Sequence, residues 1–119
     1  MLKKRAVEIC GGLGKPSKMP GKAWGTQAVA SCRIGAILAR VTDSSCAICY
    51  AYPRPFRNNY ARSNVKRAQQ RRLDALRLAM AMPEYGSVWV KAIATLIGDD
   101  NRFRWLDSGD LQSVKHLKL

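Results

Sequence analysis

The spacing of apolar and charged positions predicts one long amphipathic helix in the middle of the chain. From about residue 63 to residue 82, apolar residues recur every three or four positions, and many of the other positions carry Lys or Arg. Such spacing gathers the apolar side chains on one face of an α-helix. Ser63 is expected as the N-cap, because its hydroxyl can accept a bond from the first turn. The expected apolar stripe comprises Val65, Ala68, Leu73, Leu76, Ala79 and Met80.

A second helix is predicted directly after the first. Pro83 ends the first helix and suits the first turn of the next, where Glu84 complements the helix dipole. Gly98 is expected as the C-cap, so the second helix would run to about residue 97. The side chains expected to face inward are those of Val88, Trp89, Ile93, Leu96 and Ile97.

The rest of the chain predicts shorter elements. Residues 10–26 hold too many Gly and Pro residues for regular structure and are expected to form a loop. Residues 27–41 alternate small and apolar residues, so strand and helix are hard to separate there. Residues 52–56 are expected to be extended, because each proline biases the residue before it away from helix. A strand is predicted over 102–106, followed by a short helix from Ser108 or Asp110 to the C-terminus.

The length predicts one small domain over residues 1–119, and the order of the expected elements predicts an α/β fold. The chain is 47% hydrophobic, which excludes a disordered protein, and no apolar run reaches the roughly 18 residues of a membrane span. Residues 1–26 form a basic, Gly- and Pro-rich N-terminal segment, and residues 27–119 form the α/β metal-site unit. The first residues lack the apolar stretch of a secretory signal, so a cytoplasmic location is expected.

The positive charge is confined to the first two thirds of the chain. Residues 1–81 hold 16 Lys and Arg against 3 Asp and Glu, whereas residues 82–119 hold 5 of each, and the net charge is +13. A field of this kind attracts polyanions, of which nucleic acid is the commonest. A solubility charge and a surface for an acidic protein are the alternatives. No membrane partner is expected.

Arginine and aromatic residues alternate within this basic part. Arginine and aromatic rings together suit single-stranded nucleic acid, because rings stack on bases while guanidinium groups meet phosphates. A merely solvated helix face would normally carry compensating Glu residues, and only Asp74 is present. The residues predicted to contact nucleic acid are Arg54, Arg57, Arg62, Lys66, Arg67, Arg71, Arg72, Arg77, Tyr52, Phe56 and Tyr60.

The cysteines have the spacing of metal ligands. Cys46 and Cys49 form a Cys-x-x-Cys pair, and Cys32 would supply a third ligand. Three thiolates leave a coordination position open, as a substrate-binding iron–sulfur cluster requires, whereas Cys10 as a fourth would close a structural Zn²⁺ site. Buried free thiols are one alternative, and a redox pair is another, disfavoured by the prolines that follow Cys49.

A polar turn follows the predicted last strand. Asp107, Ser108, Gly109 and Asp110 would lie beyond the carboxyl end of that strand, where open α/β sheets bind ligands. The alternative is that Asp107 or Ser108 caps the terminal helix. The single histidine, His116, is expected to complement a helix end rather than to bind metal.

Together these segments resemble the phage gene product 88 family. The resemblance runs from Lys18 to about Val114. It is carried by residues 18–24 (Lys-Met-Pro-Gly-Lys-Ala-Trp), Cys32, residues 46–51 (Cys-Ala-Ile-Cys-Tyr-Ala), residues 64–68 (Asn-Val-Lys-Arg-Ala) and residues 103–110 (Phe-Arg-Trp-Leu-Asp-Ser-Gly-Asp).

The cysteine pattern of that family is similar to that of radical S-adenosylmethionine proteins. The resemblance implies that Cys32, Cys46 and Cys49 bind a [4Fe–4S] cluster and that residues 108–110 face S-adenosylmethionine. It implies a small, partial or truncated βα-barrel-like unit with two central helices, a cysteine-rich loop and a C-terminal strand-turn-helix. A phage-encoded protein would act in the host cell cytoplasm.

Three functions follow as expectations. The first is a phage-type metal- or iron–sulfur-binding protein with a basic nucleic-acid-binding face. The second is a truncated radical-S-adenosylmethionine-like enzyme that modifies nucleic acid or protein. The third is a small phage protein that inhibits a host defence factor by binding it, with a host protein or nucleoprotein complex as its partner.

Overall fold

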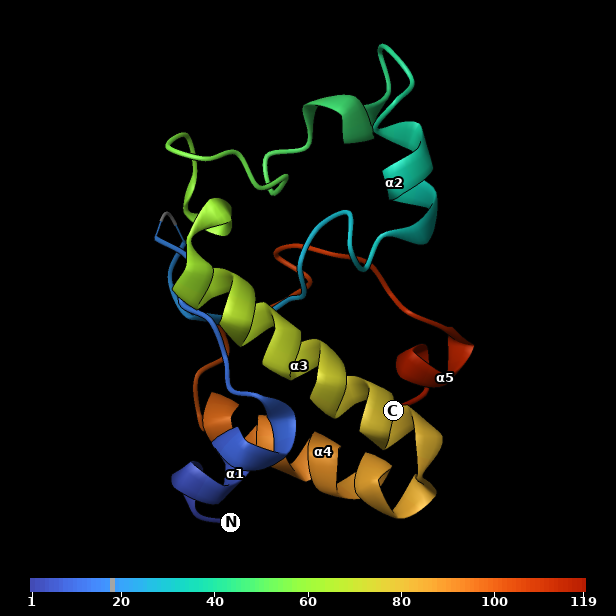
Figure 1. Ribbon diagram of the computed structural model, residues 1–119. Helices are drawn as coiled ribbons and strands as arrows, with labels where there is room; N and C mark the ends of the chain where they lie inside the picture. The colour runs from blue at the N-terminus through green and yellow to red at the C-terminus, as the bar shows by residue number, and fades with distance from the viewer. Residues whose placement is uncertain (18) are drawn as a thin grey trace.

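The fold divides into a helical body and an arm that projects from it (Figure 1). A computed structural model describes residues 1–17 and 19–119, so Lys18 lies outside the described residues. We call residues 27–62 the cysteine arm and the other elements the helical body. The body contains α1 (Lys3–Cys10), β1 (Lys22–Trp24), α3 (Ser63–Ala81), α4 (Pro83–Ile97), β2 (Phe103–Trp105) and α5 (Val114–Leu117). The arm contains α2 (Arg33–Leu38) and two 3₁₀ turns, η1 (Ser45–Ile48) and η2 (Asn59–Ala61).

The two central helices form where the apolar spacing predicts them. Helix α3 buries Leu73, Leu76 and Ala79, as expected from its stripe. Helix α4 begins with Pro83 in its first turn and is capped by Gly98.

Two details of these helices differ from prediction. Ser63 is the first helical residue of α3, and Arg62 holds the N-cap position without a side-chain bond. Val88 is exposed, because the buried positions of α4 are Gly86, Trp89, Ala92, Ile93 and Leu96, a spacing that turns position 88 toward solvent.

The N-terminal segment is more ordered than its Gly and Pro content predicts. Helix α1 packs on α4 and α3, and its Ala6 and Cys10 are fully buried. Gly11 ends α1 with a φ of 81° and comes so close to α3 that a Cβ there would lie 2.7 Å from the backbone nitrogen of Arg72. Strand β1 then forms within the predicted loop. The prediction of an irregular segment over residues 10–26 is therefore wrong where β1 lies.

The two strands are distant in sequence and pair in parallel. Lys22, Ala23 and Trp24 lie opposite Phe103, Arg104 and Trp105, and the Leu106 amide donates to the Trp24 carbonyl at 2.7 Å. The described residues thus form helices with a two-stranded parallel sheet, which confirms the α/β class. Two strands do not close a barrel, so the barrel-like arrangement is not seen in this part of the chain.

The core of the body is built around tryptophan. Trp24 and Trp89 are buried with an edge-to-face contact, and their ring centroids lie 5.7 Å apart. His116 packs against both rings. It is therefore a core residue, and its Nδ1 accepts a bond from the Gln112 amide at 3.2 Å. The terminal helix is shorter than predicted and begins where Ser113 caps it.

The cysteine arm, in contrast, has almost no core. Its only buried residues are Ala28, Ser31 and Ala51. The ambiguous segment 27–41 forms turns followed by the short helix α2. Large apolar side chains of the arm face solvent, namely Ile34, Ile37, Leu38, Val41 and Ile48. No helix among the described residues is both long enough and apolar enough to cross a membrane.

Candidate functional site

The exits of the two strands meet in a polar site, as parallel pairing requires. The Thr26 amide donates to the Ser108 carbonyl at 3.1 Å, and the Ser108 hydroxyl donates to the Thr26 carbonyl at 2.7 Å. Gly25 lies so close to Asp107 that a Cβ there would overlap the Asp107 Oδ1. Gly109 has a φ of 81° and faces the Thr26 and Ser31 hydroxyls. The predicted polar turn therefore lies at the carboxyl ends of both strands.

The hydroxyl groups of this strand-exit site form a chain with a defined direction. Ser31 donates to the Gln27 carbonyl at 2.8 Å, so the 2.7 Å bond between the Thr26 and Ser31 hydroxyls uses the Thr26 proton. The Ser108 hydroxyl donates its proton to the Thr26 carbonyl. Its oxygen therefore accepts the bond from the Gln69 Nε2 at 2.9 Å. This fixes the Gln69 amide with its Oε1 buried and without a partner among the described residues.

Arg72 belongs to this site rather than to the surface. Its side chain is only 8% exposed, and its Nε donates to the Gly12 carbonyl at 3.1 Å. A second guanidinium nitrogen lies 3.4 Å from the Gly25 carbonyl. Burial lowers the pKa of Arg72, and the nearby Asp107 carboxylate opposes that shift. The prediction that Arg72 contacts nucleic acid is wrong, because its charge is enclosed by backbone carbonyls.

Asp107 and two tyrosines connect the arm to the strand exits. Burial raises the pKa of Asp107, while Arg72 and Arg104 act against that rise. The Tyr50 hydroxyl donates to the Asp107 carbonyl, and the Tyr50 and Tyr60 rings meet edge to face. Burial, with a smaller contribution from the Asp107 charge, raises the pKa of Tyr60 to about 12. The Cys-Tyr-Ala segment is therefore docked on the site through Tyr50. The exposed Asp110 instead accepts from the Leu111 amide at 2.8 Å.

Three of the four cysteines belong to the arm, and two of them, Cys32 and Cys46, lie close together. The sulfurs of Cys32 and Cys46 are 4.0 and 3.4 Å from the point that a Cβ on Gly35 would occupy. Cys49 ends η1, and its amide donates to the Cys46 carbonyl at 3.4 Å. Over residues 1–17 and 19–119, however, no three His, Cys, Asp or Glu side chains are placed to hold one metal ion. These thiols are suitable donors, but their arrangement is not a formed metal centre.

Cys10 is not brought to the other three. It is fully buried among the core residues that join α1 to α3 and α4. Burial raises the pKa of its thiol. In Figure 1, α1 and α2 lie at opposite ends of the molecule. The four-thiolate zinc site considered from sequence is therefore not assembled.

The seven remaining basic residues among the predicted nucleic-acid contacts are referred to together as the basic face. We use that name for Arg54, Arg57, Arg62, Lys66, Arg67, Arg71 and Arg77. Within the described part of the chain, only Arg77 has an acidic partner, Asp74 at 4.0 Å. The Arg54 guanidinium lies 5.3 Å from the centre of the Tyr52 ring and donates to the Cys49 carbonyl. Phe56 is fully exposed between two of these arginines.

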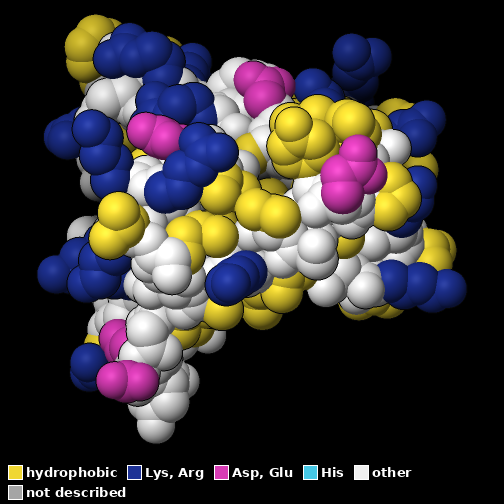
Figure 2. All heavy atoms as spheres, turned by 90° about the horizontal axis from the view of Figure 1, so that it is seen from below, with side chains coloured by type: hydrophobic (Ala, Val, Ile, Leu, Met, Phe, Trp, Pro, Cys, Tyr) yellow, Lys and Arg dark blue, Asp and Glu magenta, His cyan; other side chains and the backbone are white. Residues whose placement is uncertain are grey.

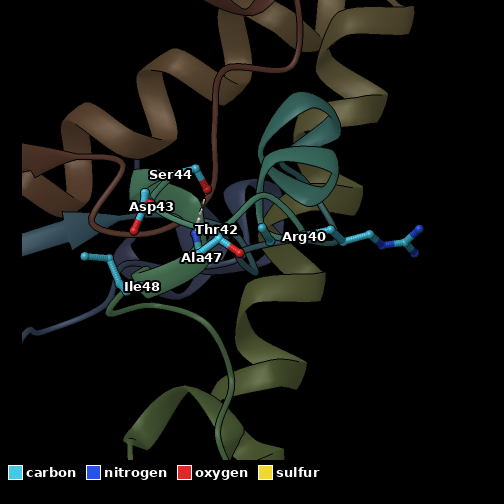
Figure 3. A pocket seen from close by; sticks show the side chains of 7 residues that line it. Arg40, Thr42, Asp43, Ser44, Ala47 and Ile48 are labelled. Carbon is cyan, nitrogen blue, oxygen red and sulfur yellow. Dashed lines mark hydrogen bonds between the residues drawn. The ribbon is translucent and has the colours of Figure 1, made fainter.

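An open hollow of about 480 Å³ lies between α2 and η1. It is lined by Ala39, Arg40, Thr42, Asp43, Ser44, Ala47 and Ile48 (Figure 3). The Ser44 hydroxyl is occupied in capping the turn, since it accepts from the Ala47 amide at 3.2 Å. Figure 3 shows the Arg40 side chain extending away from the other labelled residues. The hollow therefore lacks a convergent set of polar groups among the residues described.

Sequence reasoning missed Gln69, Thr26 and Ser31. Gln69 and Arg72 fall on the apolar stripe of α3, between Val65 and Leu76. Polar residues at buried helix positions are a signal for an internal hydrogen-bond network. Thr26 and Ser31 gave no comparable signal, because they become buried only when β1 pairs with β2.

Comparison with known protein families gives a match over most of the chain. The family model described as Gene product 88 matches residues 4–119. No curated protein and no solved structure matches the chain.

Proposed function

Because the chain belongs to the gene product 88 family, whose description names no activity, we propose from its own surface that it binds single-stranded nucleic acid. The basic face is the proposed contact. The observation that carries the proposal is a set of cations of which only Arg77 has an acidic partner in the described part of the chain, together with Phe56, a fully exposed aromatic residue close to two of these arginines in sequence.

The charge arrangement supports contact with phosphates. Arg67 and Arg71 are exposed one turn apart on α3, and the exposed Arg57 and Arg62 belong to the arm that precedes this helix. Such cations repel one another in the free protein, and a polyanion relieves that repulsion while releasing its own counterions. An ion-paired surface would gain far less from the same partner.

The aromatic residues support a single strand over a duplex. A phenyl ring that makes no contact with its own protein is available to stack on an unpaired base. Tyr52 is also exposed and already carries an arginine against its ring. In a duplex the faces of the bases are covered by their neighbours, so these rings would have nothing to stack on.

Two variants that each lose three positive charges, and so have the same net charge, test the proposal. The first variant combines Arg57→Gln, Arg67→Gln and Arg71→Gln, and the matched control combines Lys91→Gln, Lys115→Gln and Lys118→Gln. All six side chains are exposed. Binding of a fluorescent, unstructured oligonucleotide is measured by anisotropy over a range of salt concentrations. Three lost phosphate contacts should lower the slope of log affinity against log salt by about 2 in the first variant and leave it unchanged in the control. Equal slopes in both variants would contradict the proposal.

A metal centre at Cys32, Cys46 and Cys49 is a second proposal. It is favoured by one observation: the arm that carries these thiols buries almost no apolar side chain of its own. Small units of this kind are commonly held together by a metal or by disulfides. Zn²⁺ bound by these three thiolates would keep one coordination position open, and a [4Fe–4S] cluster would leave one iron open to S-adenosylmethionine. Because no three ligands are preassembled among the described residues, binding would require the thiols to move together.

Anaerobic purification tests this second proposal. We expect iron or zinc near one site per chain, lost in Cys46→Ala and Cys49→Ala. Cys10→Ala should retain the metal, because Cys10 lies in the core of the body. A broad visible absorption would identify a cluster, and its absence with bound zinc would identify a zinc site. Protein free of both metals under these conditions would contradict the proposal.

A further inference from the structure

The outer edge of β2 has unpaired backbone groups. In a parallel pair, alternate residues of each strand bond to the neighbour, and the residues between them face the other way. Since the Leu106 amide donates to Trp24, Leu106 and Arg104 face β1, and Phe103 and Trp105 direct their amides and carbonyls outward. The sheet ends at β2, and none of these outward groups has a partner among the described residues.

An apolar groove lies directly beside this edge. Its volume is about 400 Å³, and β2, α4 and the C-terminal segment enclose it. Trp105 is half exposed at the groove, and Leu117 and Leu111 on its other side are also exposed. The groove is lined by Trp89, Ile93, Trp105, Leu106, Leu111 and Leu117, among others. His116 also lines the groove, and the Trp89 indole N–H is buried without a partner among the described residues.

These two features together fit an extended peptide. Unpaired amides and carbonyls give a strand its backbone bonds, and an adjacent groove receives every second side chain. We propose that the edge of β2 binds an extended segment of another protein as a third strand. Its alternate residues are apolar and enter the groove, and a residue between them is acidic.

Arg104 is the reason to expect an acidic residue on the added strand and another protein, rather than a second copy of the chain, as the partner. Arg104 is exposed and makes no ion pair within the described part of the chain, and alternation puts it on the sheet face opposite to Trp105. A carboxylate on the added strand would lie beside it. A second copy of the chain fits poorly, because a two-fold pair of these three-residue strands would be antiparallel and centred on Arg104. Two arginines would then stand directly opposite each other, which destabilises a strand pair.

The lower face of the molecule is a separate apolar surface. Figure 2 shows apolar side chains in the centre of that face, with Lys and Arg around its margin. In the described part of the chain helices α1 and α4 form it, and helices offer no strand edge to orient an extended peptide. The edge of β2 therefore carries the inference.

The test uses the full chain and a defined probe, an acetylated and amidated Val-Glu-Val-Glu-Val peptide. Binding is followed by tryptophan fluorescence and by amide resonances of the ¹⁵N-labelled protein. We expect the Phe103 and Trp105 amides to shift and to exchange more slowly with solvent when the peptide is saturating. A peptide with Lys in place of Glu should bind about tenfold more weakly, because it meets Arg104 with a like charge.

Two variants of exposed leucines provide the matched comparison. Leu117→Asp puts a charge at the groove and should weaken binding about tenfold, whereas Leu2→Asp, at the N-cap of α1, should leave it unchanged. Unshifted Phe103 and Trp105 amides at saturating peptide would overturn the proposal. So would equal binding of the Glu and Lys peptides, or a concentration-dependent dimer that protects the same amides without peptide.

Discussion

The helical body and the cysteine arm are stabilised by different means. The body buries large side chains, including Trp24, Leu76 and Trp89, where α1, α3 and α4 meet the sheet. The arm buries two alanines and a serine and leaves its large aliphatic residues in solvent. Its contacts with the body are hydrogen bonds, such as those from Tyr50 to Asp107 and from Gln112 to Ser31. We infer that hydrophobic burial fixes the body, whereas polar contacts and any bound partner fix the arm.

The largest expected effect separates the two regions by a core truncation. Leu76→Ala should reduce the free energy of unfolding by about 2–5 kcal/mol, because Leu76 is fully buried and its removal leaves a cavity. Ile37→Ala in the arm should change it by less than about 0.5 kcal/mol, since Ile37 is 64% exposed. Urea unfolding of both variants measures the difference. Similar losses would show that the arm shares the core of the body.

The junction between the two regions should be sensitive at Gly109. Gly109→Ala should cost about 3 kcal/mol, because it combines a positive φ with overlap of the Thr26 hydroxyl. Gly98→Ala is the matched control, since Gly98 also has a positive φ but has nothing within 4 Å of its Cβ position. That variant should cost about 1 kcal/mol. Thermal unfolding compares the stability of the two variants. Equal losses would show that the strand exits accommodate a methyl group without strain.

Loss of one hydroxyl should loosen the arm without affecting the body. Tyr50→Phe removes the bond to the Asp107 carbonyl, a loss of about 1 kcal/mol. Amide hydrogen exchange should become faster over residues 45–62 and stay unchanged over α4. Tyr85→Phe on the exposed start of α4 is the control and should change neither region. Faster exchange throughout the chain would contradict the separation of the two regions.

The smallest expected effect is a pH dependence of the body. Burial lowers the pKa of His116 below its ordinary value of 6.5, so the unfolded chain binds a proton more readily than the folded one. Stability should therefore be fully present above about pH 6.5 and should decrease as the pH falls below it. The raised pKa of Asp107 acts in the opposite direction at lower pH. Urea unfolding at pH 7.5 and 5.5 should show the decrease in the wild type and a smaller one in His116→Gln.

The helices α3 and α4 could be predicted because their apolar period, proline and terminal glycine all agree. Helix α1 and strand β1 could not, because their stability comes from contacts with α4 and with β2 across about 80 residues of chain. Local Gly and Pro content misled the prediction there. Because β1 and β2 lie about 80 residues apart, only the second strand of the parallel sheet could be predicted from local sequence.

The candidate site was predicted in its location but not in its composition. The polar turn after β2 was identified because hydroxyl and carboxylate groups follow an apolar strand. Gln69 and Arg72 were not assigned to it, since an arginine within a basic run looks like a surface residue until α1 and β1 cover it. The cysteine spacing predicted three neighbouring thiols, and the arm does bring Cys32 and Cys46 to the same glycine. Whether they bind metal stays a prediction.

The most direct test of the central claim, single-strand binding by the basic face, is the affinity of an unstructured oligonucleotide for Phe56→Ala. The account predicts binding about tenfold weaker than that of the wild type, with an unchanged salt slope, because a stacking contact is lost and no charge is removed. Ile48→Ala, which truncates another exposed apolar side chain of the arm, should bind like the wild type. An affinity of Phe56→Ala equal to that of the wild type would contradict the account.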